Sequence, residues 1–542
     1  MIRPTAVALA LAAAIHGQES SGRTPAAGTT VLFPFDEVSV PWRDNLKVTL
    51  NKPVKHPGNP VFAPGPPDSP DGIGAILYGT VIHDRGKLRM WYLAWPRPDA
   101  RIPGDPERHR YHRPIAYAES EDGIRWTRPE LGLADFRGNR RNNLVRVEPE
   151  SEAYSRCADF ISVLLDEADP DPSRRYKMAY IVQDQKRRNA TTATAVSPDG
   201  LRWKLVNTDM ITRGHFENTS LLRFNGLYYA SGQNFDPHGG HRMDGSAAGR
   251  LMTVFFSPDF RHWSTGRAVG FLRRDYQTKP LAFGQETHMG AGLWNRGNVI
   301  LGVYGRWYGD TIVGKPVRLA GLKMDLGFVV SNDAIHYREP VPDYRLLEHG
   351  GNDEWDSESL LQGNAFANVG DRTLIWYSHW NTSNPYPFPS LPAKVEIKPQ
   401  AVGLATLRRD GFGYFDKQVP GREASLLSAP LRGDGVSRVW LNIDGAGPDS
   451  PLEIELTDDA ERRIPGYGAT ARESGLRVPV RFANGAATPA GKTFRVRAAW
   501  PAAANAKLFA VYVDRAGSVP AVQASVTGGG FSLSGPGGRM GR

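Results

Sequence analysis

The stretch Ser120-Glu121-Asp122-Gly123-Ile124-Arg125-Trp126 decides the fold, because related stretches recur along the 542-residue chain. The copies share a polar pair, an Asp at the third position and an aromatic residue at the seventh. Their Asp residues are Asp122, Asp199, Asp259, Asp333 and Asp410. An Asp side chain at this place can accept hydrogen bonds from its own backbone, so each copy predicts a turn between two strands.

A strand, a turn and a second strand precede each copy. Thr80-Val81-Ile82-His83-Asp84-Arg85-Gly86 leads into Leu88–Tyr92, and Ser220–Gly226 leads into Leu227–Tyr229. The Arg-Gly and Asn-Gly pairs are typical of tight hairpins. Four strands in each of five units predict an all-β fold, a five-bladed β-propeller in which a closed ring of sheets buries the sheet faces. A β-sandwich or a solenoid is the alternative.

Changes in composition and in hydrophobic patterning divide the rest of the chain into segments. We expect a signal peptide over 1–20, where Arg3 precedes an apolar run, the propeller over 33–418, a β-sandwich over 425–516, and a disordered Gly-rich tail over 517–542. No later segment is apolar and long enough for a membrane span. These features predict a secreted or periplasmic protein.

The charge and the cysteine content exclude some classes of protein. The formal charge is +9 and the pI about 9.4, but the basic residues are dispersed, which argues against a nucleic-acid partner. Cys157 is the single cysteine, so no intrachain disulfide can form. The oligomeric state is not predicted.

The innermost strands of a propeller line its central funnel, and function is expected where they begin. Alignment on the turn glycines places Leu77, Asp159, Glu217, His288 and a position near Leu361 at one level. Cleavage of a glycosidic bond needs one protonated and one ionised carboxyl group, and neighbouring carboxylates can supply both. The candidate substrate-binding residues are His215, Asn218, Glu286, His288, Arg306, Trp307, Asp356 and Glu358.

The segment Phe216-Glu217-Asn218-Thr219-Ser220-Leu221 resembles the third-blade segment of the five-bladed propeller glycosidases, glycoside hydrolase families 32, 43 and 68. The sandwich, with Ile464-Pro465-Gly466-Tyr467, resembles the C-terminal module of bacterial family 32-like proteins. The resemblance implies that Glu217 is the general acid, that Asp159 stabilises the transition state and that Asp71 is the nucleophile or base. The first blade departs from the family 32 pattern, since Pro67-Asp68-Ser69-Pro70-Asp71-Gly72 replaces its Trp-x-Asn-Asp-Pro-Asn motif.

Three functions are compatible with these features. The first is a glycoside hydrolase with a carbohydrate substrate and no cofactor, apart from a possible structural cation on the propeller axis. The second is a carbohydrate-binding propeller whose catalytic residues have been lost. The third is a sialidase-like enzyme, because the Ser-x-Asp-Gly-x-x-Trp turn resembles the Asp-box, although sialidases have six blades.

Overall fold

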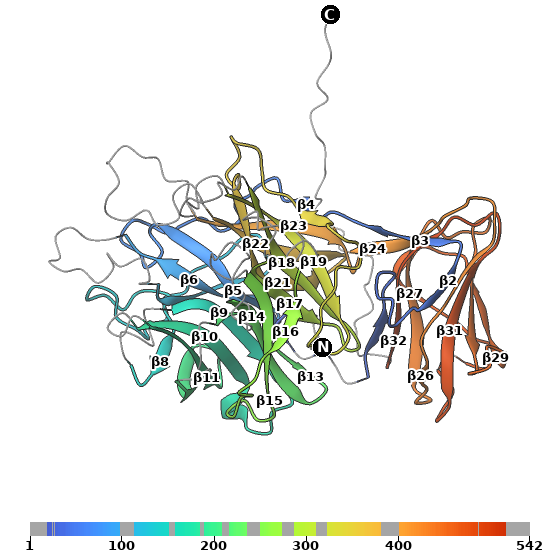
Figure 1. The fold of residues 1–542 in the computed structure, drawn as a ribbon, viewed down its shortest axis with the longest axis horizontal. Helices are drawn as coiled ribbons and strands as arrows, with labels where there is room; N and C mark the ends of the chain where they lie inside the picture. The colour runs from blue at the N-terminus through green and yellow to red at the C-terminus, as the bar shows by residue number, and fades with distance from the viewer. Residues whose placement is uncertain are drawn as a thin grey trace, which may run out of the picture.

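The computed structural model describes residues 19–23, 25, 28–97, 113–150, 158–184, 189–208, 216–235, 250–273, 287–309, 322–380, 400–485 and 487–515. Within these residues the strands form two bodies, a propeller at the left of Figure 1 and a two-sheet sandwich at its right. The chain is therefore an all-β protein with a five-bladed propeller and a β-sandwich, as predicted, and the described strands form five blades where a sialidase has six.

Each blade begins with an inner strand, and the inner strands contact one another in cyclic order. Blade 1 contains β5 (Gly74–Asp84), β6 (Lys87–Trp95) and β7 (Ile115–Ser120). Blade 2 contains β9 (Ala158–Leu165), β10 (Tyr176–Asp184), β11 (Asn189–Ser197) and β12 (Arg202–Asn207), with β8 (Arg146–Glu148) parallel to β12. Blade 3 contains β13 (Glu217–Phe224), β14 (Leu227–Phe235), β15 (Arg250–Ser257) and β16 (Ala268–Phe271). Blade 4 contains β17 (Thr287–Asn295), β18 (Ile300–Gly309), β19 (Leu322–Ser331) and β20 (Arg345–Leu347).

Blade 5 combines two distant parts of the chain. It contains β21 (Ser359–Val369), β22 (Arg372–Trp380), β23 (Val402–Arg408) and β4 (Val54–Lys55). In blades 2 and 3 the strand after the Asp turn completes the blade, whereas after Asp410 the chain leaves the ring. The early strand β4 takes the fourth place and so closes the ring.

This exchange corrects the predicted boundaries. The sandwich has one sheet made of β1 (Thr30–Leu32), β3 (Leu46–Leu50), β24 (Gly413–Lys417), β27 (Ser437–Asp444), β30 (Gly475–Pro479) and β32 (Lys507–Arg515). Its other sheet is made of β2 (Trp42–Asp44), β25 (Ala424–Leu427), β26 (Leu431–Arg432), β28 (Leu452–Thr457), β29 (Arg463–Ala471) and β31 (Thr493–Trp500). Segments 30–50 and 413–417, which we expected mainly in the propeller, thus belong to the sandwich. The tail 517–542 lies outside the described residues.

The repeated turns follow their predicted chemistry in blades 1 to 4. In the first copy the Asp122 Oδ1 accepts hydrogen bonds from the backbone N–H groups of Ile124 and Arg125, at 2.9 and 2.8 Å. The Asp199, Asp259 and Asp333 carboxylates accept the equivalent pairs of hydrogen bonds. The predicted hairpins are also confirmed, because Arg85-Gly86 and Asn225-Gly226 have positive φ at both residues and join directly paired strands.

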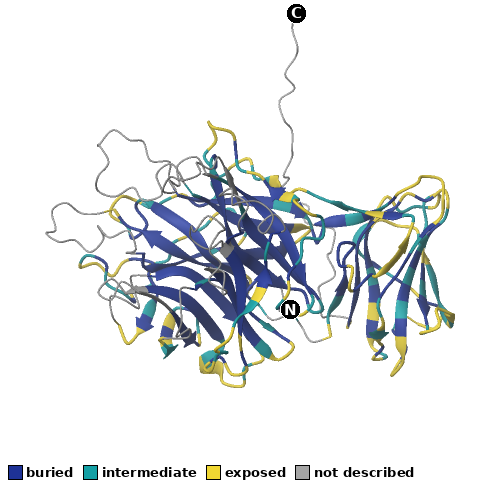
Figure 2. Ribbon diagram, viewed as in Figure 1, coloured by how far each residue is buried: buried dark blue, intermediate teal, exposed yellow. Residues whose placement is uncertain are grey.

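Asp410 differs from the other turn residues, because it is buried at the junction of the two bodies. Its carboxylate forms an ion pair with Arg296 and accepts hydrogen bonds from Asn368, at 2.9 Å, and from the Tyr512 hydroxyl of the sandwich, at 2.8 Å. Figure 2 shows that the blades and the inner faces of the sandwich are buried. Asp410 therefore joins the two bodies by a polar contact within this interior.

The segment 19–23 lies across the end of the ring at which the inner strands finish. The Ser21 hydroxyl donates to the Asn364 carbonyl oxygen of β21, at 2.7 Å, and the Gly22 carbonyl oxygen accepts from Leu165 of β9, at 2.6 Å. The Ser20 hydroxyl accepts from His83 N–H of β5, at 2.9 Å. Residues 1–18 lie outside the described residues, but the predicted signal-peptide boundary at residue 20 falls within this packed segment.

Candidate functional site at the entrance of the propeller

Each inner strand has a β-bulge near its first residues, which marks equivalent positions around the ring. We call the end of the ring where the inner strands begin the entrance. The last paired residues before the bulges are Ile76, Asp159, Asn218, His288 and Gln362. The predicted level had Asp159 and His288 in place and the other three residues displaced by one position. The bulges insert different numbers of residues, so counting from the turn glycines cannot align the strands.

Two of the predicted carboxylates lie at the entrance, on the neighbouring strands β9 and β13. The Asp159 carboxylate is 7% exposed and forms an ion pair with the Arg113 guanidinium, with an N–O distance of 2.6 Å. Glu217 is the first residue of β13 and is half-buried, and its Oε2 accepts a hydrogen bond from the Gln233 amide. Two acidic groups that are far apart in the sequence thus begin adjacent inner strands.

Aromatic rings from four blades gather at the same end of the ring. The His288 imidazole stacks on the Trp380 indole, with a centroid distance of 5.2 Å. Tyr78 lies 4.2 Å from Phe160 and 6.5 Å from His288, between ring centroids. Because these residues come from blades 1, 2, 4 and 5, their contacts show that the inner strands bring side chains together at the axis. His288, Phe160 and Tyr78 are buried, whereas Trp380 is partly exposed, so Trp380 is the ring of this group that a sugar could reach.

Two amides link adjacent blades at the bulge level. The Asn218 Nδ2 donates to the Ala179 carbonyl oxygen of blade 2, at 3.2 Å, and the Gln362 Nε2 donates to the His288 carbonyl oxygen of blade 4, at 2.7 Å. Their oxygens, Asn218 Oδ1 and Gln362 Oε1, are buried and have no hydrogen-bond partner within the described residues. Asn218 was predicted to bind substrate, whereas Gln362 was not singled out.

Asp71 is placed away from the inner strands. It is fully buried, and its carboxylate forms an ion pair with Arg128 at 2.7 Å. It also accepts hydrogen bonds from the Ser69 hydroxyl and the Tyr92 hydroxyl, each at 2.9 Å. The carboxylate predicted as nucleophile or base is thus fully buried and held by Arg128, Ser69 and Tyr92, and it is not presented at the entrance. Ile76 occupies the bulge position of blade 1, so this position carries an apolar side chain and no carboxylate.

Asp356, predicted to bind substrate, instead supports ring closure. It is buried, forms an ion pair with the Lys55 ammonium of β4 at 2.7 Å and accepts a hydrogen bond from the Tyr377 hydroxyl at 2.8 Å. Burial and the nearby Asp356 charge raise the pKa of Tyr377. Asp356 therefore holds the early strand β4 against blade 5.

The remaining predicted residues have mixed placements. Arg306 lies opposite Thr287, the first residue of β17, and donates to the Asp343 carboxylate at 2.9 Å. The Glu358 carbonyl oxygen accepts a hydrogen bond from Met324 N–H at 3.1 Å, and Glu358 has a φ of 82°. His215, Glu286 and the Trp307 side chain lie outside the described part of the chain.

The described residues contain no group of three or more His, Cys, Asp and Glu side chains arranged to hold a metal ion. The described residues also include no helix that is long and apolar enough to cross a membrane.

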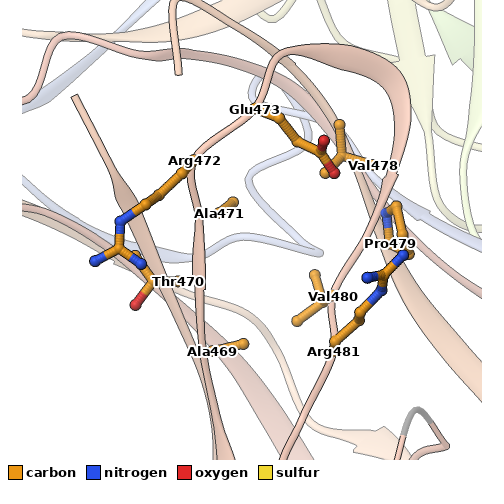
Figure 3. A pocket seen from close by; sticks show the side chains of 9 residues that line it. All are labelled: Ala469, Thr470, Ala471, Arg472, Glu473, Val478, Pro479, Val480 and Arg481. Carbon is orange, nitrogen blue, oxygen red and sulfur yellow. The ribbon is translucent and has the colours of Figure 1, made fainter. Parts of the chain in front are cut away.

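A pocket in the sandwich is less suited to glycosidic cleavage. It has a volume of about 340 Å³ and lies between the edge strands β29 and β30. Figure 3 shows the Ala469, Ala471 and Val480 side chains within it and the charged side chains of Arg472, Glu473 and Arg481 around it. Glu473 is the single carboxyl group among its lining residues, so the pocket lacks a carboxylate pair.

The sequence left several entrance residues unnoticed. Arg113 and Gln233 hold the two carboxylates, and Tyr78, Phe160 and Trp380 supply aromatic rings. Phe160 is the bulge residue of β9, with a φ of 45°. A positive φ at a non-glycine residue is uncommon, and nothing in the sequence around Phe160 predicts this conformation.

Comparisons with known proteins identify structural neighbours at low identity. No protein-family model matches the chain, and no curated protein matches it. A glycosyl hydrolase from Bacteroides ovatus is 13% identical, with a TM-score of 0.42 over 66% of this chain and 94% of its own. A family 43 arabinoxylan arabinofuranohydrolase from Bacillus subtilis is 11% identical, with a TM-score of 0.36 over 86% of this chain and 99% of its own. An exo-β-1,3-galactanase from Phanerochaete chrysosporium is 8% identical, with a TM-score of 0.35 over 87% of this chain and 100% of its own.

Proposed function

We propose that the chain is a glycoside hydrolase that cleaves its substrate at the entrance of the propeller. The observation that carries this proposal is the position of Asp159 and Glu217 at the start of two neighbouring inner strands, β9 and β13. Glycosidic cleavage requires two carboxyl groups with different roles on either side of the bond. In this proposal Asp159 and Glu217 are the two carboxyl groups that the reaction needs.

The surroundings of the two groups suggest the assignment of roles. The Arg113 guanidinium stabilises the negative charge of Asp159, and an ionised carboxylate can act as a nucleophile, a base or a stabiliser of positive charge on the sugar. The Gln233 amide donates a hydrogen bond to Glu217, which resembles the general acid of the propeller glycosidases. Glu217 then protonates the leaving oxygen, and Asp159 supplies the negative charge.

The Trp380 ring gives the proposed substrate a place to bind. Trp380 is partly exposed and stacks on the buried His288 imidazole, while the Tyr78 and Phe160 rings pack against each other in the interior. The apolar face of a sugar ring packs on an indole surface while its hydroxyls meet polar groups. A carbohydrate is therefore the proposed substrate.

We infer that the protein acts outside the cytoplasm, with a leader cleaved before Glu19. The Glu19 carboxylate pairs with Arg296 at 3.1 Å and with Arg409 at 3.2 Å, and cleavage after residue 20 would remove these contacts. The intact mass of the protein recovered from a secreting host tests the inference. A mature chain that is shortened at its N-terminus and starts at or before residue 19 agrees with it, and an uncleaved chain or one starting at residue 21 contradicts it.

Hydrolysis assays test the proposed activity. We expect the protein to hydrolyse at least one of a panel of p-nitrophenyl furanosides and pyranosides. For the phenyl glycoside of the accepted sugar, Glu217→Gln should lower kcat by about 10²–10⁴-fold. Glu121→Gln, on an exposed turn of blade 1, is the matched control and should leave kcat unchanged. A Glu217→Gln enzyme as fast as the wild type would contradict the proposal.

A carbohydrate-binding propeller without hydrolytic activity is the second candidate. It is favoured by the buried ion pair of Asp71 and by Ile76 at the bulge position of blade 1, which leave that blade without an exposed acid at this level. Sugar binding that depends on Trp380, together with no hydrolysis across the panel, would favour this candidate.

A further inference from the structure

A pocket of about 480 Å³, which we call the rim pocket, lies beside blade 1, and none of its lining residues is among those described at the entrance. Its lining residues come from the loop before β5 and from the segment after β7. They are Asp68, Ser69, Pro70, Arg128, Glu130, Phe136, Arg137, Asn139, Arg141, Asn142 and Asn143. Pro70 is four residues from the start of β5, so the pocket is close along the chain to the first inner strand.

Hydrogen bonds around the buried Asp71 carboxylate connect three of the residues that line the rim pocket. Ser69 and Arg128 both line the pocket and bind the Asp71 carboxylate. Asn143 also lines it and donates to the Tyr92 hydroxyl at 2.8 Å, which in turn donates to Asp71. Burial of a carboxylate and a guanidinium is costly unless they are paired, and here the paired groups fix the positions of three lining residues.

Three charged side chains at the rim pocket are exposed and available to a ligand. Among the described residues, Asp68, Glu130 and Arg141 make no side-chain hydrogen bond or ion pair. Two carboxylates offer acceptors, and the guanidinium of Arg141 offers donors. A sugar hydroxyl both donates and accepts, so a neutral polyol uses both sets of groups.

Charged and apolar ligands fit this lining less well. The lining carries both signs of charge, since Asp68 and Glu130 stand with Arg128, Arg137 and Arg141, so neither an anion nor a cation meets a lining of purely opposite charge. An apolar molecule would remove exposed charged groups from water without replacing their hydrogen bonds. The Phe136 ring beneath them is buried, and the Arg137 guanidinium lies over it, 5.0 Å from the ring centroid.

We infer that the rim pocket binds a neutral sugar unit of a glycan chain, at a distance from the bond that is cleaved. This inference rests on the proposed function for its substrate class. Asp71 is then a positioning residue, which acts through Ser69 and Arg128 and does not touch the sugar.

Affinity electrophoresis of the full chain tests the inference. Native gels containing wheat arabinoxylan, yeast mannan or levan provide neutral probes, and polygalacturonate provides an anionic one. The test variant is Glu130→Gln with Arg141→Ala, and the matched control is Glu121→Gln with Arg140→Ala. Both double variants leave the net charge unchanged, and all four residues are exposed, so folding and mobility in plain gels should be preserved.

We expect at least one neutral polysaccharide to retard the wild type and the control equally and to bind the test variant about tenfold more weakly. The kcat for the aryl glycoside should be the same for all three proteins. Equal retardation of the test variant and the wild type would overturn the inference, as would no retardation by any neutral probe or stronger retardation by polygalacturonate. Loss of the proposed function is separable, because it shows as an absence of Glu217-dependent hydrolysis whatever the gels show.

Discussion

The Trp91 indole Nε1 of blade 1 donates a hydrogen bond to the Gly200 carbonyl oxygen in the Asp turn of blade 2, at 2.7 Å. Trp376 of blade 5 makes the same contact with Gly123 in the Asp turn of blade 1, at 2.9 Å. The repeated turn therefore has a second role, since its carbonyl binds the preceding blade. Its glycine allows this approach, because a Cβ at Gly123 or Gly200 would lie 2.6 Å from the Trp ring.

Replacing one of these glycines should loosen the ring. We expect Gly200→Ala to lower the free energy of unfolding by about 2–4 kcal/mol, because it combines a positive φ with a steric clash. Gly226→Ala separates the two effects, since Gly226 has a φ of 84° but no atom within 4 Å of an added Cβ. It should cost about 1 kcal/mol. Denaturant unfolding measures both, and equal losses would show that the Trp91 contact is unimportant.

The junction between propeller and sandwich should weaken in acid. Burial raises the pKa of Asp410, but the Arg296 and Arg409 guanidiniums and the Asn368 hydrogen bond together lower this pKa from 3.8 to about 2. A carboxyl group whose pKa is lowered by folding stabilises the protein above its unfolded pKa, and this stabilisation disappears as the pH falls through the folded pKa. The contribution of Asp410 should be complete above about pH 4 and lost towards pH 2.

Urea unfolding of the wild type and Asp410→Asn measures this effect. The variant should be less stable at pH 7, and the difference in the free energy of unfolding should shrink between pH 4 and pH 2. A difference that is the same at every pH would contradict the charge-based explanation.

Ring closure by β4 should depend on the Lys55–Asp356 pair. Lys55→Met leaves the buried Asp356 carboxylate without its cation and should lower the free energy of unfolding by about 2–3 kcal/mol, given that Lys55 is partly exposed. The control Lys47→Met breaks a pair with Asp416 in which both side chains are exposed. It should cost less than about 1 kcal/mol. Similar losses in the two variants in thermal or urea unfolding would contradict a special role for Lys55.

Substitution of Asp71 should affect stability more than catalysis. Asp71→Asn weakens the buried pair with Arg128 and should lower the free energy of unfolding by about 2–4 kcal/mol. The kcat for the accepted aryl glycoside, measured well below the unfolding temperature, should stay within about threefold of the wild type. A stable Asp71→Asn protein with a kcat lowered by about a thousandfold would restore Asp71 as the nucleophile or base.

The sequence predicted the features of the fold that arise from local chemistry. The hydrogen bonds of Asp122 and the positive φ of Asn225 and Gly226 depend on neighbouring residues, so the local sequence predicts them. The place of β4 in blade 5 depends on pairing across the whole propeller and has no local signal. The burial of Asp410 at the junction of propeller and sandwich follows from that pairing, so the local sequence does not predict it either.

The candidate site was predicted in part. Asp159 and Glu217 could be found because each precedes an apolar inner strand, which fixes its place at the entrance. Asp71 and Asp356 also precede inner strands, but their carboxylates turn to Arg128 and Lys55, which lie far away in sequence. The burial of an acid by a distant cation is a property of the packed structure.

The dependence of the Glu217→Gln rate on the leaving group is the most direct measurement of the proposed catalysis. A phenyl leaving group needs a proton from the general acid, whereas 2,4-dinitrophenolate leaves without one. For the same sugar, we predict that Glu217→Gln lowers kcat about a thousandfold with phenyl and less than about tenfold with 2,4-dinitrophenyl. Equal losses with the two leaving groups, or no loss with either, would contradict the role of Glu217 as the proton donor at the entrance of the propeller.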